Sequence, residues 1–236
     1  MCNLYEQATR QAVETSVQQL GLSLAFEGEP QAKTVGPFGS GLFLRPSVAG
    51  LVAQVGQWGM IRPGQAERVP ERRYQTNNAR IETVADKPTF RAAWRAGRRC
   101  LVPAAWYAEP NWETGRNIWW HLRRADGQPW FLAGLWSEWV DPVSGEMVPN
   151  YTVLTCNCDT HTLLSRLHKP DPKVGSDQQD KRSLIHIAPQ DWAQWLNGST
   201  EQAMRLVRAE EAGAFDQGDA HKADELLANM RGGSLF

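Results

Sequence analysis

The chain has 236 residues, of which 42% are hydrophobic, and a formal net charge of −1. This balance argues against a protein that binds nucleic acid through its overall charge, and the length suits one large domain or two small ones. No apolar run approaches the roughly 20 residues of a membrane helix, and the first residues do not resemble a signal peptide, so we expect a cytoplasmic protein. The four cysteines form no disulfide framework, and a reducing compartment would keep them as thiols.

The first half of the chain predicts short helices between strands. Residues 8–22 space their apolar side chains as an amphipathic helix, which ends at a glycine. Glycine and proline punctuate residues 34–46, which predicts a loop that leads into a short strand. Residues 50–63 are typical of a strand pair. An extended stretch at 78–84 is followed by a helix at 87–97, which begins near a proline and ends at a glycine.

The second half is dominated by strands. Four successive strands are predicted, at 98–110, 117–127, 128–140 and 150–158. They are followed by a helix at 159–168, a loop at 169–182, a strand at 183–188 and a helix at 190–198. Ser199 and Gln202 have the spacing of a capping box, which predicts a polar helical tail over about 199–236. Strands outnumber helices and no linker is evident, so we expect a single domain over residues 2–236, with a mainly antiparallel α+β fold.

The distribution of charge and the number of tryptophans suggest possible binding surfaces. Residues 62–99 contain ten bases and four acids, a local net charge of +6. Such a surface could meet phosphates, although a solvated helix face is an equally good interpretation. The chain also contains eleven tryptophans. Most are expected in the core or in a groove wall, with two or three facing a ligand.

One cluster has metal-ligand character. Cys156 and Cys158 are close in sequence to His161 and His168, but the spacing is not that of a common structural zinc site. No phosphate loop, dinucleotide fingerprint or zincin helix is present. We therefore expect neither a metal nor another cofactor.

Several single residues are candidates for chemistry. Cys2 would carry an α-amine beside its thiol if Met1 were removed. Glu109 is the only acid in an apolar and aromatic stretch, surroundings that raise a carboxyl pKa and suit a proton donor, unless the side chain points into water. His168 opens a proline-rich loop, where a surface histidine is the simpler alternative. Asn78 could equally be a turn residue and Arg80 a surface charge.

Five separated blocks occur in one order along the chain: MC at the start, WG at Trp58, NARIET from Asn78, CLVPA leading to Glu109, and His168 after the strand TVLT. Together they resemble the SOS response-associated peptidase family, whose members begin Met-Cys and cross-link to abasic sites in DNA. The resemblance covers roughly residues 2–196.

The resemblance implies a strongly bent, barrel-like β-sheet with flanking helices, a groove for single-stranded DNA, and loss of Met1. It also implies roles for individual residues. Cys2 would be the nucleophile, Asn78 would orient it or the sugar aldehyde, Glu109 would act as acid and base, and His168 would be a second proton shuttle. The implied DNA contacts are a phosphate held by Arg80, bases against Trp58, and further contacts from Pro37 and Thr155.

The chain also departs from the family pattern. Many members read Met-Cys-Gly-Arg, whereas this chain has Asn3 and Leu4, so one phosphate contact is absent. The acid lies in Tyr-Ala-Glu-Pro rather than between an aromatic residue and Trp, and GPFG replaces the usual NVAP loop, with Pro37 as the nearest counterpart. Members commonly continue from the histidine to Arg-Met-Pro, whereas here residues 169–182 intervene before the next strand.

The implied chemistry is consistent with the residue types. An abasic sugar opens to an aldehyde, which an amine attacks to form a Schiff base. An α-amine has a pKa of about 7.7 to 8.0, so a useful fraction is neutral at neutral pH. The thiol of the same residue can then close a thiazolidine, an intramolecular step favoured by proximity. We expect a monomer that acts on single-stranded DNA at the nucleoid, with no membrane partner.

Two other functions remain open at this point. An N-terminal cysteine beside an acid also suits a peptidase of the N-terminal-nucleophile type, and this alternative includes autocatalytic removal of Met1. The third possibility is a non-catalytic protein that binds single-stranded DNA, in which Cys2 is incidental.

Overall fold

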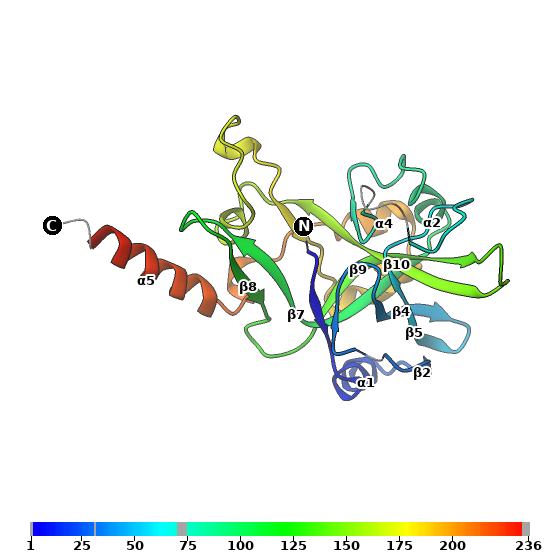
Figure 1. The fold of residues 1–236 in the computed structure, drawn as a ribbon. Coiled ribbons are helices and arrows are strands. Elements are labelled where there is room, and N and C mark those ends of the chain that lie inside the picture. Colours follow the sequence, from blue (N-terminus) through cyan, green and yellow to red (C-terminus); the bar gives the residue numbers. More distant parts are fainter. Residues whose placement is uncertain (1, 31, 70–74, 233–236) are drawn as a thin grey trace.

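In the computed structural model, one sheet organises the chain, with short helices around it (Figure 1). The structure describes residues 2–30, 32–69 and 75–232. The described strands are β1 (Tyr5–Gln7), β2 (Leu24–Glu27), β3 (Thr34–Val35), β4 (Ser40–Ser47), β5 (Gly50–Trp58), β6 (Asn78–Arg80), β7 (Arg99–Asn111), β8 (Ile118–Leu122), β9 (Trp130–Val140), β10 (Met147–Asn157) and β11 (Arg182–Leu184). The described α-helices are α1 (Arg10–Gln19), α2 (Arg91–Arg95), α3 (Trp192–Asn197), α4 (Thr200–Met204) and α5 (Gly218–Gly232).

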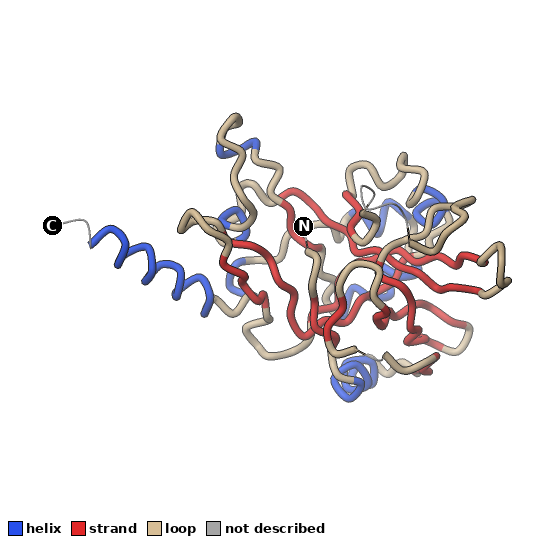
Figure 2. Tube along the Cα trace, in the orientation of Figure 1, coloured by secondary structure: helices blue, strands red, loops and turns tan. Residues whose placement is uncertain are grey.

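Five of the strands close into a barrel. β5 pairs with β4, β4 with β7, β7 with β9 and β9 with β10, all antiparallel, and β10 returns to β5 in parallel. The other strands extend this barrel, and Figure 2 shows the helices and loops at its periphery. The predicted α+β class, with a mainly antiparallel, strongly bent and barrel-like sheet, is therefore confirmed.

Alternate residues of the barrel strands enter two different core clusters. In β7, Leu101 packs with residues of α1, α2 and α3, whereas its neighbours Cys100 and Val102 belong to the cluster that contains Cys2 and Tyr5. Period-two alternation places successive side chains on opposite faces of a strand. Helices α1, α2 and α3 thus stabilise one face, and the other face surrounds the start of the chain.

The start of the chain is built into the sheet. β1 pairs antiparallel with β7, with Tyr5 opposite Tyr107, and with β3 on its other side. The hydroxyl of Tyr5 lies 2.5 Å from that of Tyr151 on β10. Gly41 on β4 lies directly against this pair, where an added Cβ would collide with both hydroxyls. This close approach needs glycine and ties β1, β4 and β10 together.

Most predicted elements occur in the structure, with informative exceptions. The helix at 8–22 and the four successive strands are confirmed. The strand pair predicted at 50–63 is wrong: β5 is one continuous strand, and its hairpin partner is β4. The helix predicted at 159–168 is also wrong. There the ring nitrogen Nδ1 of His161 accepts hydrogen bonds from the backbone N–H groups of residues 163 and 164, and only a 3₁₀ turn forms, at Leu164–Arg166.

The polar tail is helical in part. α4 begins at the predicted capping box, in which Ser199 and Gln202 exchange hydrogen bonds. A 3₁₀ turn at Ala212–Ala214 lies between α4 and α5, and α5 extends away from the barrel in Figure 1. Residues 233–236 of the predicted tail lie outside the described residues, as do residues 70–74 of the basic segment. None of the described helices has both the length and the apolar character that a membrane span requires.

Candidate active site

Two adjacent asparagines hold the carbonyl group of Cys2. The side-chain amide of Asn78 donates to this carbonyl oxygen at 2.7 Å, and that of Asn77 donates at 3.2 Å. Asn77 also donates to the side-chain oxygen of Asn3 at 3.2 Å. Asn78 opens β6, which runs parallel to β10. Sequence analysis identified Asn78 and missed Asn77, although the asparagine doublet was a visible signal.

The Cys2 thiol is enclosed in protein. Its side chain has no exposed surface, and Sγ lies 3.4 Å from the carbonyl oxygen of Leu4. Burial raises the pKa of this thiol well above its ordinary value, and the negative charge of Glu109 raises it further. The sulfur is therefore held as a thiol, which needs a base before it can act as a nucleophile.

Glu109 comes from β7, the strand that pairs with β1. Its backbone lies opposite Trp120 on β8, and only 3% of the residue is exposed. Burial disfavours the carboxylate and raises the pKa of Glu109 to about 7. The group is thus divided between its acid and base forms near neutral pH, as a residue that both donates and accepts protons requires.

His168 approaches Glu109 from a different segment. Its Nε2 lies 3.5 Å from Oε2 of Glu109 and 3.3 Å from the carbonyl oxygen of Arg182. The backbone of His168 has a φ of 63°, and its N–H donates to the carbonyl oxygen of Pro110 at 2.6 Å. Burial lowers the pKa of His168 to about 4, so the imidazole is neutral at neutral pH.

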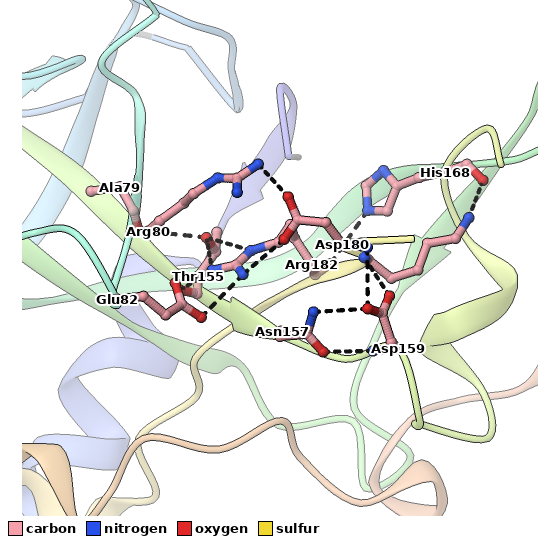
Figure 3. A network of polar contacts seen from close by, with 10 residues as sticks. Ala79, Arg80, Glu82, Thr155, Asn157, Asp159, His168, Asp180 and Arg182 are labelled. Carbon is pink, nitrogen blue, oxygen red and sulfur yellow. Dashed lines mark hydrogen bonds and ion pairs between the residues drawn. The ribbon is translucent and has the colours of Figure 1, made fainter. Parts of the chain in front are cut away.

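Arg80 lies in a neighbouring network of charges, drawn in Figure 3. Its side chain is 47% exposed and forms an ion pair with Asp180 at 2.5 Å. Asp180 also contacts Arg182 at 3.3 Å, and the guanidinium of Arg182 binds Glu82 at 2.7 Å. Sequence analysis identified Arg80 and missed these carboxylate and guanidinium partners, because ordinary loop composition surrounds them.

The other predicted DNA contacts have different positions. The ring of Trp58 is fully buried, with its Nε1 donating to the carbonyl of Asn77 at 2.8 Å, and its contact with bases stays a prediction. Its indole supports the asparagine beneath Cys2. Thr155 is also buried, with Oγ1 3.4 Å from Nε of Arg182. Pro37 is half-buried before Phe38, whose φ is 64°, and its contact with DNA stays a prediction.

The structure therefore brings four of the predicted residues together: Cys2, Asn78, Glu109 and His168. They come from the chain start, β6, β7 and the segment after β10. Within the described ranges, no group of three or more His, Cys, Asp or Glu side chains is arranged to hold a metal ion. The site combines a buried thiol, a carboxyl group that titrates near pH 7 and a neutral imidazole, a set suited to nucleophilic attack with proton transfer.

Comparison with known proteins gives consistent matches. The model of the family described as "SOS response associated peptidase (SRAP)" matches residues 1–223. The abasic site processing protein YoqW of Bacillus subtilis is 24% identical over 180 residues, which cover 75% of this chain and 72% of that protein. The abasic site processing protein HMCES of Xenopus tropicalis is 25% identical over 169 residues, 64% of this chain but only 48% of its own length.

Solved structures share the fold. A crystal structure of a protein from Bordetella bronchiseptica matches with a TM-score of 0.78 and 27% identity, over 91% of this chain and 97% of that chain. A protein from Bacteroides thetaiotaomicron matches with a TM-score of 0.72 and 21% identity, over 91% and 90%. The barrel and its flanking elements are thus common to these proteins.

Replacing Asn78 with alanine is expected to loosen the chain start. The variant loses a donor to a buried carbonyl, worth about 1.4 kcal/mol, and Cys2 should react with iodoacetamide about tenfold faster. Peptide mass spectrometry of the native protein measures the rate at each cysteine. Asn197→Ala, an exposed change on α3, is the matched control. Equal acceleration at Cys100, Cys156 and Cys158 would indicate general unfolding, and an unchanged rate at Cys2 would contradict the anchoring role.

Proposed function

The chain belongs to the SOS response associated peptidase family, and from this premise we propose that it captures abasic sites in single-stranded DNA covalently through Cys2. The observation that carries the proposal is the convergence of Glu109 and His168 on a cysteine at the chain start. The relatives named as abasic site processing proteins support the substrate class. Removal of Met1 is part of the proposal, because it frees the α-amine.

The first step is attack of the Cys2 α-amine on the aldehyde carbon of the open abasic sugar. A C–N bond forms, the carbonyl oxygen becomes a hydroxyl with a proton from the amine, and loss of water from this carbinolamine gives a protonated imine, whose nitrogen keeps its other hydrogen. The leaving hydroxyl needs a proton. Glu109, whose pKa is about 7, supplies it and becomes a carboxylate.

The second step is closure of a thiazolidine ring. The Cys2 sulfur loses its proton to a base and adds to the carbon of the protonated imine. The electron pair of the C=N double bond moves to the nitrogen, which becomes a neutral amine that keeps its hydrogen. Since burial holds the sulfur as a thiol, a base must act first, and the Glu109 carboxylate left by the first step is that base. The neutral His168 beside Glu109 provides a second proton acceptor. One water is released in total, and no oxidant or reductant is required.

The amide groups of Asn77 and Asn78 serve the same reaction by position. They fix the carbonyl of the nucleophilic residue, so its amine and thiol have little freedom to leave the proton-transfer groups. Holding reacting groups in place replaces an intermolecular search with an intramolecular step. The DNA itself is proposed to lie along Arg80 and the other lysine and arginine side chains of residues 62–99.

The central experiment mixes purified protein with single-stranded DNA that carries one abasic site. The parent should form an adduct stable to denaturant, with the mass of protein without Met1 plus DNA less one water. Cys2→Ala retains an α-amine but lacks sulfur, so it should form only an imine that is lost unless borohydride reduces it. Cys156→Ala should behave as the parent does.

Each alternative has its own result. Equally durable attachment of Cys2→Ala would refute the thiazolidine. Turnover of a peptide without any DNA adduct would favour a peptidase, and salt-sensitive binding with neither product would favour a non-catalytic DNA-binding protein.

The rate of adduct formation is expected to peak between about pH 7 and pH 8. The neutral α-amine becomes more abundant up to its pKa of about 7.7 to 8.0. The protonated form of Glu109 declines above its pKa of about 7. Glu109→Gln should be about 100-fold slower and lose the decline on the alkaline side. Single-turnover rates measured across pH test this, with Glu138→Gln, an exposed change on β9, as control. An alkaline decline that persists in Glu109→Gln would assign it to another group.

Reversing the charge of Arg80 is expected to weaken binding of single-stranded DNA by about tenfold at low salt, with a smaller loss at high salt. Fluorescence anisotropy with an undamaged oligonucleotide measures binding apart from the covalent step. Arg205→Glu is the matched control, because Arg205 is also exposed and also paired with a carboxylate, at 2.6 Å. Equal affinity of Arg80→Glu and parent would remove Arg80 from the DNA surface.

A further inference from the structure

A buried lysine closes the loop that follows His168. Lys181 is only 6% exposed, and its Nζ donates to the carbonyl oxygens of Leu167 and His168, both at 2.6 Å. Burial of an ammonium group is costly, and its hydrogen-bond partners in the described part of the chain are carbonyls rather than a carboxylate. Such a placement favours a specific role over general stability.

The backbone beside Lys181 is fixed as well. Its N–H donates to the Asp159 carboxylate at 2.7 Å, and the N–H of Asp180 donates to the other oxygen at 3.1 Å. Asp159 itself accepts from the side chain of Asn157 at 3.0 Å, at the end of β10. The backbone of Lys181 is therefore anchored to the end of β10, and from there its side chain reaches the carbonyl oxygen of His168.

The loop between His168 and Lys181 is closed internally by Gln179. Its side-chain amide donates to the carbonyls of Asp171, Val174 and Gly175, at 3.0 to 3.1 Å. Its Oε1 accepts from the N–H of Asp171 at 2.7 Å. A loop that is folded on itself and fastened at its end can extend the chain after His168 without moving the imidazole.

We propose that Lys181 is the positioning residue that holds His168 against Glu109 across this extended loop. The proposal rests on the proposed function for its catalytic consequence, and on geometry alone for the positioning itself. The backbone of His168 is in the left-handed region, which a residue with a Cβ adopts at a cost. Two bonds hold it there, from its N–H to Pro110 and from Lys181 to its carbonyl.

The lysine also supplies charge. Its positive charge also lowers the pKa of His168, although by less than burial and the charge of the terminal amine do. The Nε2 atom of the imidazole lies 3.5 Å from Oε2 of Glu109. His168 and Lys181 also line a cavity of about 480 Å³, together with the charged residues Glu113, Asp159, Arg166 and Asp177. Lys181 is the cation among these groups that contacts His168 directly, so its removal should change both the orientation and the protonation of the imidazole.

The test compares Lys181→Met, Lys181→Arg and Lys173→Met in the full chain. Lys173 is an exposed lysine of the same loop and serves as the matched control. The first measurement is the titration of the His168 ring by NMR, with His168→Gln to assign the signal. In the parent and in Lys173→Met, we expect the ring to stay neutral down to about pH 4. In Lys181→Met the midpoint should rise by about one pH unit, and Lys181→Arg should restore the parental behaviour.

The second measurement is the single-turnover rate of adduct formation, which should fall about tenfold in Lys181→Met and recover in Lys181→Arg. The unfolding midpoint of each variant shows whether the fold survives. If Lys181→Met folds and the His168 titration is unchanged, the positioning role is overturned. If Lys181→Met does not fold, a parental titration in Lys181→Arg supports the role and an altered one opposes it. A parent that forms no adduct would refute the proposed function, while the titration still decides the role of Lys181.

Discussion

The pairing of β1 with β7 is the constraint on which the site depends. It aligns the first residues of the chain with the strand that carries Glu109, and the N–H of Ala108 donates to the carbonyl of Leu4 at 2.9 Å. Chain ends are usually the least ordered parts of a domain because few contacts hold them. Here the end lies between two strands, and Tyr5 reaches across to Tyr151. The asparagine amides then fix the carbonyl of Cys2, which gives this residue a defined position relative to Glu109 and His168.

Burial imposes one electrostatic rule on that site: each titratable group is pushed toward its neutral form. The pKa of Cys2 rises, that of Glu109 rises to about 7 and that of His168 falls to about 4. A reaction that begins with a neutral amine and a neutral aldehyde fits such surroundings, because no charged reactant has to be desolvated at the start. In the proposed reaction, the same rule requires proton transfer between neighbouring groups. A buried thiol with a raised pKa is not readily deprotonated by a base from solvent. In this proposal, the carboxylate formed beside it accepts its proton.

Sequence reasoning identified candidate residues that the fold brings together where a residue type is chemically distinctive, and it failed where a contact joins distant parts of the chain. Cys2 and Glu109 are identifiable because a terminal cysteine and a lone acid among apolar residues are unusual. Asn77 is not, because its bond joins residues 75 positions apart and its sequence neighbours give no sign of that contact. The exposure of Trp58 has the same difficulty, since an aromatic ring suits a core and a groove wall equally well.

The strands of the barrel could likewise be predicted from the sequence, whereas the contacts made by the loops could not. The strand runs and their antiparallel character follow from alternation and turn residues. The missing helix after β10 follows from one side chain, His161, which takes the N–H groups a helix would begin with. Lys181 lies in a polar stretch of ordinary composition, and only the folded chain shows its ammonium beneath two carbonyls.

The ion pairs at the proposed DNA surface affect how much of the selectivity comes from ionic binding and how much from the covalent reaction. Arg80 and Arg182 are both engaged by carboxylates, Asp180 between them and Glu82 beyond. A phosphate that approaches Arg80 competes with Asp180, so the cost of breaking this ion pair offsets part of the binding free energy of the phosphate. Together with the net charge of −1, this competition favours a modest affinity for undamaged single-stranded DNA. In the proposed reaction, selectivity then comes from the aldehyde: a strand without one dissociates, and a strand with one is held by a covalent bond whose lifetime does not depend on ionic contacts.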